Sequence, residues 1–94
     1  MKKPTQLLKY YIETLKLECN QARFTEDKYT CNCIIAKLEY ILKQGIRPDT
    51  ARISAYIDTL KAKANSALTG SEWQAYTEAR NKLKQIRKLV RKHK

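Results

Sequence analysis

A six-residue block that occurs twice in this sequence, 45 positions apart, constrains the fold more than any other feature. Residues 11–16 read Tyr-Ile-Glu-Thr-Leu-Lys, and residues 56–61 read Tyr-Ile-Asp-Thr-Leu-Lys. At the same shift, 12 of the 40 residues in 5–44 are identical to their counterparts in 50–89. We therefore predict that one structural unit has been duplicated in tandem, with repeats at residues 5–44 and 50–89.

The repeated unit has the pattern of two amphipathic helices. Apolar residues recur at steps of three and four in segments covering about residues 4–22, 26–44, 50–68 and 72–92. The expected buried stripes are Leu8, Ile12, Leu15, Cys19 and Ala22; Cys31, Ile34, Ile35, Leu38, Ile41 and Leu42; Ile53, Ile57, Leu60, Ala64 and Ala67; and Tyr76, Ala79, Leu83, Ile86 and Val90. Two glycines and two prolines are too few for the many turns of an all-β chain.

Short polar segments mark the ends of these helices. Thr25 and Asp49 are expected N-caps of the second and third helices, and Gly45 is an expected left-handed C-cap. Ser71 and Gln74 have the spacing of a capping box at the start of the fourth helix. Helices of similar length joined by short loops pack as antiparallel neighbours. We predict a single all-α domain over residues 1–94: an antiparallel four-helix bundle built from two duplicated αα-hairpins.

Two further apolar stripes bear on assembly. One consists of Tyr10, Leu17 and Phe24, and the other of Tyr29, Cys33, Ala36 and Tyr40. An apolar face wider than one seam indicates either a helix at the centre of the fold or a contact between subunits. A homodimer is therefore one of the assemblies that the sequence allows.

Positive charge is concentrated at the C-terminal end. The chain has a formal net charge of +11, and residues 80–94 hold eight basic residues and no acid. The repeat offers an internal comparison. Residues 26–44 carry three acids and three lysines, whereas residues 72–92 carry two acids against seven basic residues. Because the two segments occupy equivalent places in the repeat, the fold itself does not require the charge of the fourth helix.

Four of these cations form what we call the basic stripe: Arg80, Lys84, Arg87 and Arg91. Their steps of four, three and four place them on one helical face over about 16 Å. Lys88 and Lys92 flank the stripe. Arginine forks and lysines at this spacing are suited to phosphates, so we expect a non-enzymatic protein that binds DNA or RNA through phosphate contacts. Trp73 and Tyr76 precede the stripe and are candidates for stacking on bases.

Other interpretations remain open from the sequence. Cations near a helix C-terminus are also favoured by the helix dipole, so part of the charge is expected on a merely solvated face. A second function class is a protein-interaction module, such as an inhibitor, adaptor or immunity-type protein, that docks on an acidic protein surface. A basic amphipathic helix lying on an anionic membrane is less consistent with the sequence, because the apolar residues opposite the charges are needed to close the bundle.

Catalytic and metal-binding patterns are weak. The single histidine, His93, is next to the last residue, and the acids are scattered among basic neighbours. Three cysteines, Cys19, Cys31 and Cys33, are an odd number, and residues two apart on a helix point in different directions. We expect no enzyme activity, no cofactor and no metal, with the cysteines acting as small apolar residues. Lys9 interrupts the only apolar stretch near the N-terminus, so a cytoplasmic location is expected.

Overall fold

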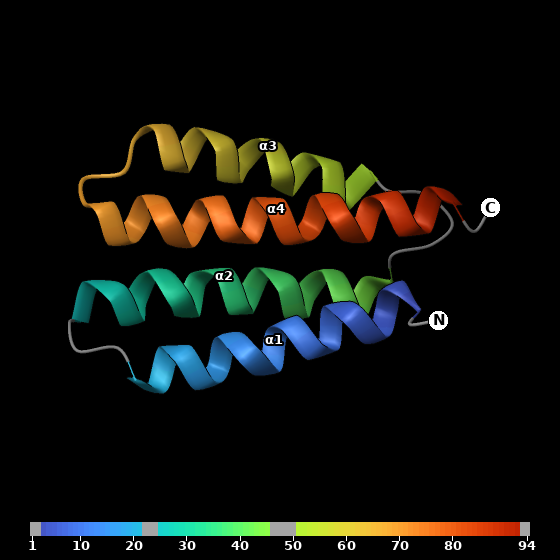
Figure 1. The fold of residues 1–94 in the computed structure, drawn as a ribbon, viewed down its shortest axis with the longest axis horizontal. Coiled ribbons are helices and arrows are strands. Elements are labelled where there is room, and N and C mark those ends of the chain that lie inside the picture. The colour runs from blue at the N-terminus through green and yellow to red at the C-terminus, as the bar shows by residue number, and fades with distance from the viewer. Residues whose placement is uncertain (1–2, 22–24, 46–50, 93–94) are drawn as a thin grey trace.

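Four α-helices account for nearly all of the residues that the computed structural model describes, which are 3–21, 25–45 and 51–92. They are α1 (Pro4–Gln21), α2 (Thr25–Gln44), α3 (Ala51–Asn65) and α4 (Gly70–Lys92), and the described residues include no strand. The prediction of an all-helical chain with four helices is confirmed. The helices lie along one long axis, and the chain direction alternates from each helix to the next (Figure 1).

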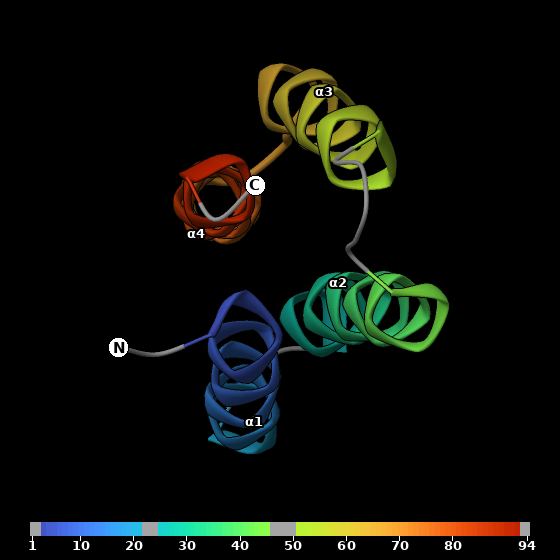
Figure 2. The same cartoon turned by 90° about the vertical axis from the view of Figure 1, so that its right-hand side faces the viewer.

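The packing of the helices is compatible with a bundle. Seen end-on, α3 lies beside α4 and α1 beside α2, and α1 and α3 are the two helices farthest apart (Figure 2). The most extensive contacts join α1 to α2 and α3 to α4, and α4 also packs against α1 and α2. The helix with the basic stripe therefore also contributes to the core, and its charge must be carried on the sides that face away from that core.

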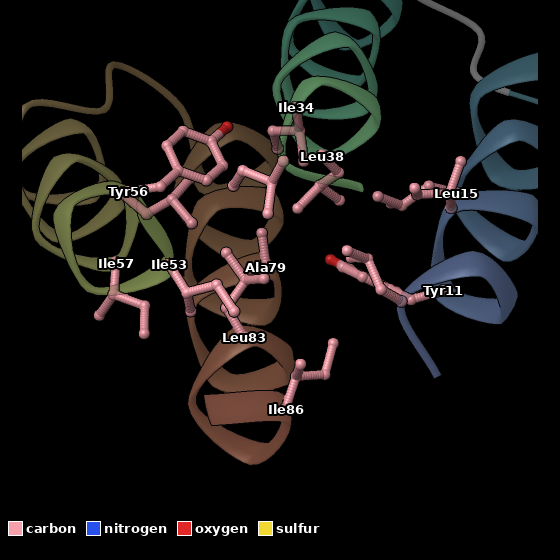
Figure 3. Packing of buried hydrophobic residues seen from close by; sticks show 14 of the residues in the cluster. Tyr11, Leu15, Ile34, Leu38, Ile53, Tyr56, Ile57, Ala79, Leu83 and Ile86 are labelled. Carbon is pink, nitrogen blue, oxygen red and sulfur yellow. The ribbon is translucent and has the colours of Figure 1, made fainter. Parts of the chain in front are cut away.

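Side chains from all four helices meet along the centre of the molecule (Figure 3). The five apolar positions predicted for α4 are all buried, at 9% exposure or less: Tyr76, Ala79, Leu83, Ile86 and Val90. Leu83 and Leu38 have no exposed surface. Full burial of such a side chain stabilises the fold by about 1.5–3 kcal/mol. These residues fix the rotation of α4 and therefore the direction of its cations.

The core differs in detail from the predicted stripes. Tyr11 and Tyr56 are 7% exposed and belong to the core, although neither was in a predicted stripe. Cys31 and Leu42 were expected in the core but are only half-buried and pack against it. Ala67 lies beyond the end of α3 and is also half-buried, and Ala22 lies outside the described residues. The two tyrosine rings widen the buried face of α1 and α3 beyond the predicted stripes.

One predicted helix end is confirmed and one is wrong. Gly45 has a φ of 90°, and its N–H donates to the carbonyls of Ile41 (3.0 Å) and Leu42 (3.3 Å). The predicted capping box of Ser71 and Gln74 is not formed. Instead, the backbone N–H of Glu72 donates to Oγ1 of Thr69 (3.1 Å), and the Glu72 carboxylate accepts the N–H of Leu68 (2.9 Å). A carboxylate accepts more strongly than an amide and is favoured by the positive end of the helix, so α4 begins at Gly70.

The α3 helix ends at Asn65, earlier than the predicted end near Leu68. Its last turn tightens, because the N–H of Ser66 is shared between the carbonyls of Ala62 (3.1 Å) and Lys63 (3.2 Å). Leu68 lies beyond this end of α3, and its backbone N–H donates to the Glu72 carboxylate in the cap of α4. The caps predicted at Thr25 and Asp49 depend on side chains outside the described residues.

Candidate nucleic-acid interface

The basic stripe lies along the edge of α4, one residue after each core position. Core residues Ala79, Leu83, Ile86 and Val90 are followed directly by Arg80, Lys84, Arg87 and Arg91. Successive residues of a helix are about 100° apart, so the stripe runs beside the buried face rather than opposite to it. The spacing in the sequence predicted that the four cations share one face of the helix. The buried residues of the structure show that this face borders the core.

The stripe faces the seam between α3 and α4. The Nη1 atom of Arg87 donates a hydrogen bond to Oγ of Ser54 on α3, at 3.2 Å. Arg80, Lys84 and Arg87 are half-buried, whereas Arg91 and Lys88 are exposed. Such long side chains bury their methylene groups and keep the charged end in water. The side chain of Lys92 lies outside the described residues. Ser54 was not predicted, because only contact across the seam identifies it.

No carboxylate compensates this charge in the described part of the chain. Both ion pairs there involve Lys16 of α1, which lies 3.6 Å from Glu39 and 3.9 Å from Glu13. The Nε atom of Arg80 is buried and has no hydrogen-bond partner among the described residues. A buried donor without a partner costs about 1–3 kcal/mol. The seam between α3 and α4 therefore holds cations at an energetic cost to the fold.

The equivalent positions of α2 are apolar or acidic. At a shift of 45, Ile35, Glu39 and Leu42 correspond to Arg80, Lys84 and Arg87. Ile35 is 6% exposed and belongs to the core, and Leu42 packs against it. A comparison of the repeats position by position, rather than by net charge, identifies these three exchanges directly from the sequence.

The two aromatic candidates lie in different environments. Trp73 is 53% exposed, and its position seven residues, or about two helical turns, before Arg80 places it on the same edge of α4 as the basic stripe. Tyr76 is in the core at 9% exposure, with Nζ of Lys63 5.9 Å from the centre of its ring. Only Trp73 of this pair presents most of its ring to solvent.

Two grooves lie between the hairpins, and their lining residues correspond. One, of about 240 Å³, is lined by Lys37, Tyr40, Ile41, Arg52, Ala55, Tyr56 and Thr59. Shifting these positions by 45 gives Lys82, Gln85, Ile86, Leu7, Tyr10, Tyr11 and Thr14, and all seven line the other groove, of about 380 Å³. The lining residues of the two grooves are therefore equivalent, although α1 and α4 pack together more extensively than α2 and α3 do. The basic stripe lies on the other edge of α4, outside both grooves.

A third cavity, of about 350 Å³, contains two of the cysteines. Cys19, Cys31, Glu18 and Glu78 are among its lining residues. The thiol of Cys31 donates to the carbonyl of Leu15 at 3.4 Å. Burial, followed by a hydrogen bond with Cys19, raises the pKa of Cys31 to about 12. A thiol with this pKa stays protonated at neutral pH and is a poor nucleophile or metal ligand. Cys19 is buried, as expected of a small apolar residue, and Cys33 is half-buried.

Comparisons with known proteins leave the family open. No family model matches the chain, and no curated protein or solved structure has significant similarity to it. Among the described residues, no helix has the length and apolar character needed to cross a lipid bilayer. The function must therefore be inferred from the physical chemistry of the seam between α3 and α4.

Proposed function

We propose that this protein binds nucleic acid without catalysis, through phosphate contacts from the basic stripe of α4. The observation that carries the proposal is the exchange of Ile35, Glu39 and Leu42 in the first hairpin for three cations in the second. Two of the exchanged residues pack in or against the core of the first hairpin. An arginine at such a position gives up part of the apolar packing that isoleucine or leucine provides, and the single hydrogen bond from Arg87 to Ser54 does not account for three cations, so an anionic ligand is the best reason for their presence.

The dimensions of the stripe suit a nucleic-acid backbone. From Arg80 to Arg91 the stripe extends about 16 Å along the helix, and each strand of duplex DNA carries one phosphate per about 3.4 Å of axis. Several neighbouring phosphates are therefore within reach of one helix edge. Trp73 lies on the same edge at 53% exposure and is the better placed of the two stacking candidates.

The test is binding to fluorescein-labelled duplex DNA, single-stranded DNA and RNA, measured by fluorescence anisotropy across a salt series. The control variant has all four residues of the stripe replaced by glutamine. We expect micromolar or tighter binding near physiological salt that the variant loses, with a log–log salt slope of about −3 to −6 for the intact protein. Binding that is absent at this salt, or that survives in a folded variant, would contradict the proposal.

We further propose that the bundle is a tandem duplication of an antiparallel αα-hairpin. Eight buried residues of the first hairpin have a buried counterpart 45 positions later, which supports this origin. The pairs are Leu8 and Ile53, Tyr11 and Tyr56, Ile12 and Ile57, Leu15 and Leu60, Cys19 and Ala64, Ile34 and Ala79, Leu38 and Leu83, and Ile41 and Ile86. A chain made of two copies of residues 5–49 should then fold into a helical bundle. A chain that stays unfolded by circular dichroism would contradict the equivalence of the hairpins.

A second candidate function is that of a protein-interaction module, which the exposed apolar residues favour. Tyr10 and Leu17 on α1 are 66% and 65% exposed, and Tyr29 and Tyr40 on α2 are 71% and 49% exposed. Exposed apolar residues of this kind would also serve a homodimer. Saturable binding to one protein that nuclease treatment does not affect would support the module. A sedimentation coefficient that rises with concentration would support the homodimer.

A further inference from the structure

The seam of the first hairpin carries a cluster of charges, and the equivalent positions of the second hairpin have the opposite net charge. In the first hairpin, Lys16 of α1 lies between two acids, 3.9 Å from Glu13 and 3.6 Å from Glu39. At a shift of 45, the three positions hold Asp58, Lys61 and Lys84. One cation between two acids has become one acid beside two cations.

The two exchanges beside this cluster increase the difference. Arg80 and Arg87 occupy the places of two uncharged residues, Ile35 and Leu42. Over these five positions, the first seam holds one cation and two acids, and the second holds four cations and one acid. The local charge therefore changes from −1 to +3.

Two structural features justify the transfer of the geometry from the first seam to the second. Within each hairpin the two helices form the most extensive contacts of the bundle, α1 with α2 and α3 with α4. The edge of α2 that holds Glu39 faces α1, because Glu39 pairs with Lys16, and the equivalent edge of α4 borders the seam between α3 and α4. The hydrogen bond from Arg87 to Ser54 crosses that seam. Lys84 and Lys61 correspond in sequence to Glu39 and Lys16, and they belong to the two helices that form the α3/α4 seam.

We infer that a backbone phosphate of the nucleic acid takes the place of the missing carboxylate, held between Lys61 of α3 and Lys84 of α4. This inference rests on the proposed function and extends it to a second helix and to a defined position. The guanidinium of Arg80, whose Nε is buried without a partner among the described residues, lies about one turn before Lys84 and provides further donors.

A phosphodiester backbone explains the seam better than a single acidic side chain does. One carboxylate would compensate the cluster, as Glu39 does in the first hairpin. The cations, however, continue past the cluster to Arg87 and Arg91, along about 16 Å of helix. A regularly repeated anion neutralises such a row, and a phosphate offers several acceptor oxygens to lysines and arginine forks.

The decisive variant exchanges two charges between the seams, Lys84→Glu together with Glu39→Lys. The double variant keeps the formal net charge at +11. Any change in its affinity for nucleic acid therefore results from where the charges lie and not from the total charge. We expect its affinity for a duplex of about 20 base pairs to fall at least ten-fold near 0.1 M salt. We expect the variant to fold, because Glu39 is exposed and Lys84 is half-buried and an exposed ion pair contributes at most about 1 kcal/mol; circular dichroism verifies the fold.

A matched pair of single variants isolates Lys61. Lys61→Gln should weaken binding roughly five- to ten-fold near 0.1 M salt and reduce the steepness of the salt slope by about 0.9, the value for one duplex phosphate contact. Lys16→Gln removes the same charge at the equivalent position of α1 and should leave both quantities unchanged. Because Lys61 is exposed, both variants are expected to fold, which circular dichroism verifies.

The outcomes separate this inference from the function on which it rests. If the unaltered protein binds no nucleic acid, the proposed function fails, and the phosphate site fails with it. If the unaltered protein binds and the charge-exchange variant binds equally well, only the phosphate site is overturned. If polyglutamate binds more tightly than the duplex and Lys61→Gln weakens it selectively, the ligand is an acidic protein and the assignment to phosphate is wrong.

Discussion

Replacing Arg80 with isoleucine should stabilise the protein and weaken its binding to nucleic acid. Isoleucine is the residue at the equivalent position 35 of α2, where it is 6% exposed. The Nε of Arg80 is buried without a partner among the described residues, and such a group costs about 1–3 kcal/mol. Since Arg80 is only half-buried, and its methylene groups already contribute packing, we expect a net gain near the lower limit, about 1 kcal/mol.

A gain of this size is measurable. In a domain of 94 residues, about 1 kcal/mol raises the melting temperature by roughly 4–8 °C. The assays are thermal melting by circular dichroism and urea unfolding, in which the midpoint should rise with an unchanged m value. The reverse substitution, Ile35→Arg, buries a charge in the core of the first hairpin and should cost about 2–4 kcal/mol.

A result in the opposite direction would refute the reasoning. If Arg80→Ile lowers the melting temperature by several degrees, the arginine contributes to the fold and its charge needs no ligand to explain it. If the variant is more stable but binds nucleic acid as well as the unaltered protein, the energetic analysis of the seam is correct and Arg80 is not a binding residue.

Three further outcomes are expected. Tyr11→Phe should leave the free energy of unfolding in urea unchanged or raise it by up to about 1 kcal/mol, because the hydroxyl of Tyr11 is buried without a hydrogen-bond partner among the described residues. A large decrease in the free energy of unfolding would indicate that the hydroxyl has a partner in solution. Burial raises the pKa values of Tyr11 and Tyr56 above 10. As the pH rises, the unfolded chain therefore loses the protons of these phenols before the folded chain does. The free energy of unfolding should then fall above pH 10 by at most about 1.4 kcal/mol per pH unit for each tyrosine. Constant stability up to pH 12 would contradict the burial of these rings. Nucleic acid should quench the fluorescence of Trp73, the single tryptophan, and unchanged emission at saturation would place the ligand away from the N-terminal end of the stripe.

The sequence predicted the core of α4 because its buried residues form a single apolar stripe, although the helix packs against three others. Leu83 and Val90 recur at helical spacing, and no competing apolar stripe surrounds them. Tyr11 and Tyr56 were not predicted to be buried, because each precedes an isoleucine that already fills the expected position of the apolar stripe. Their burial depends on the space between hairpins, which a single-helix pattern does not describe.

The candidate site was predicted in part. The common face of the four cations followed from spacing, but the half-burial of Lys84 depends on the rotation of α4 against α3. Lys61 belongs to another helix and carries no signal by itself. It emerges only when the ion pair of Lys16 and Glu39 is transferred across the repeat. Likewise, two overlapping capping patterns lie between residues 69 and 74, and the spacing alone did not distinguish the cap formed by Thr69 and Glu72.

The most direct test of the central claim is a nuclear magnetic resonance titration of backbone amides with a short DNA duplex and a short RNA, near physiological salt. The account predicts shifts concentrated along residues 80–91 of α4 and around Lys61 of α3, with α1 and the outer face of α2 unaffected. Shifts concentrated around Tyr29 and Tyr40, or no shifts with either nucleic acid, would contradict it.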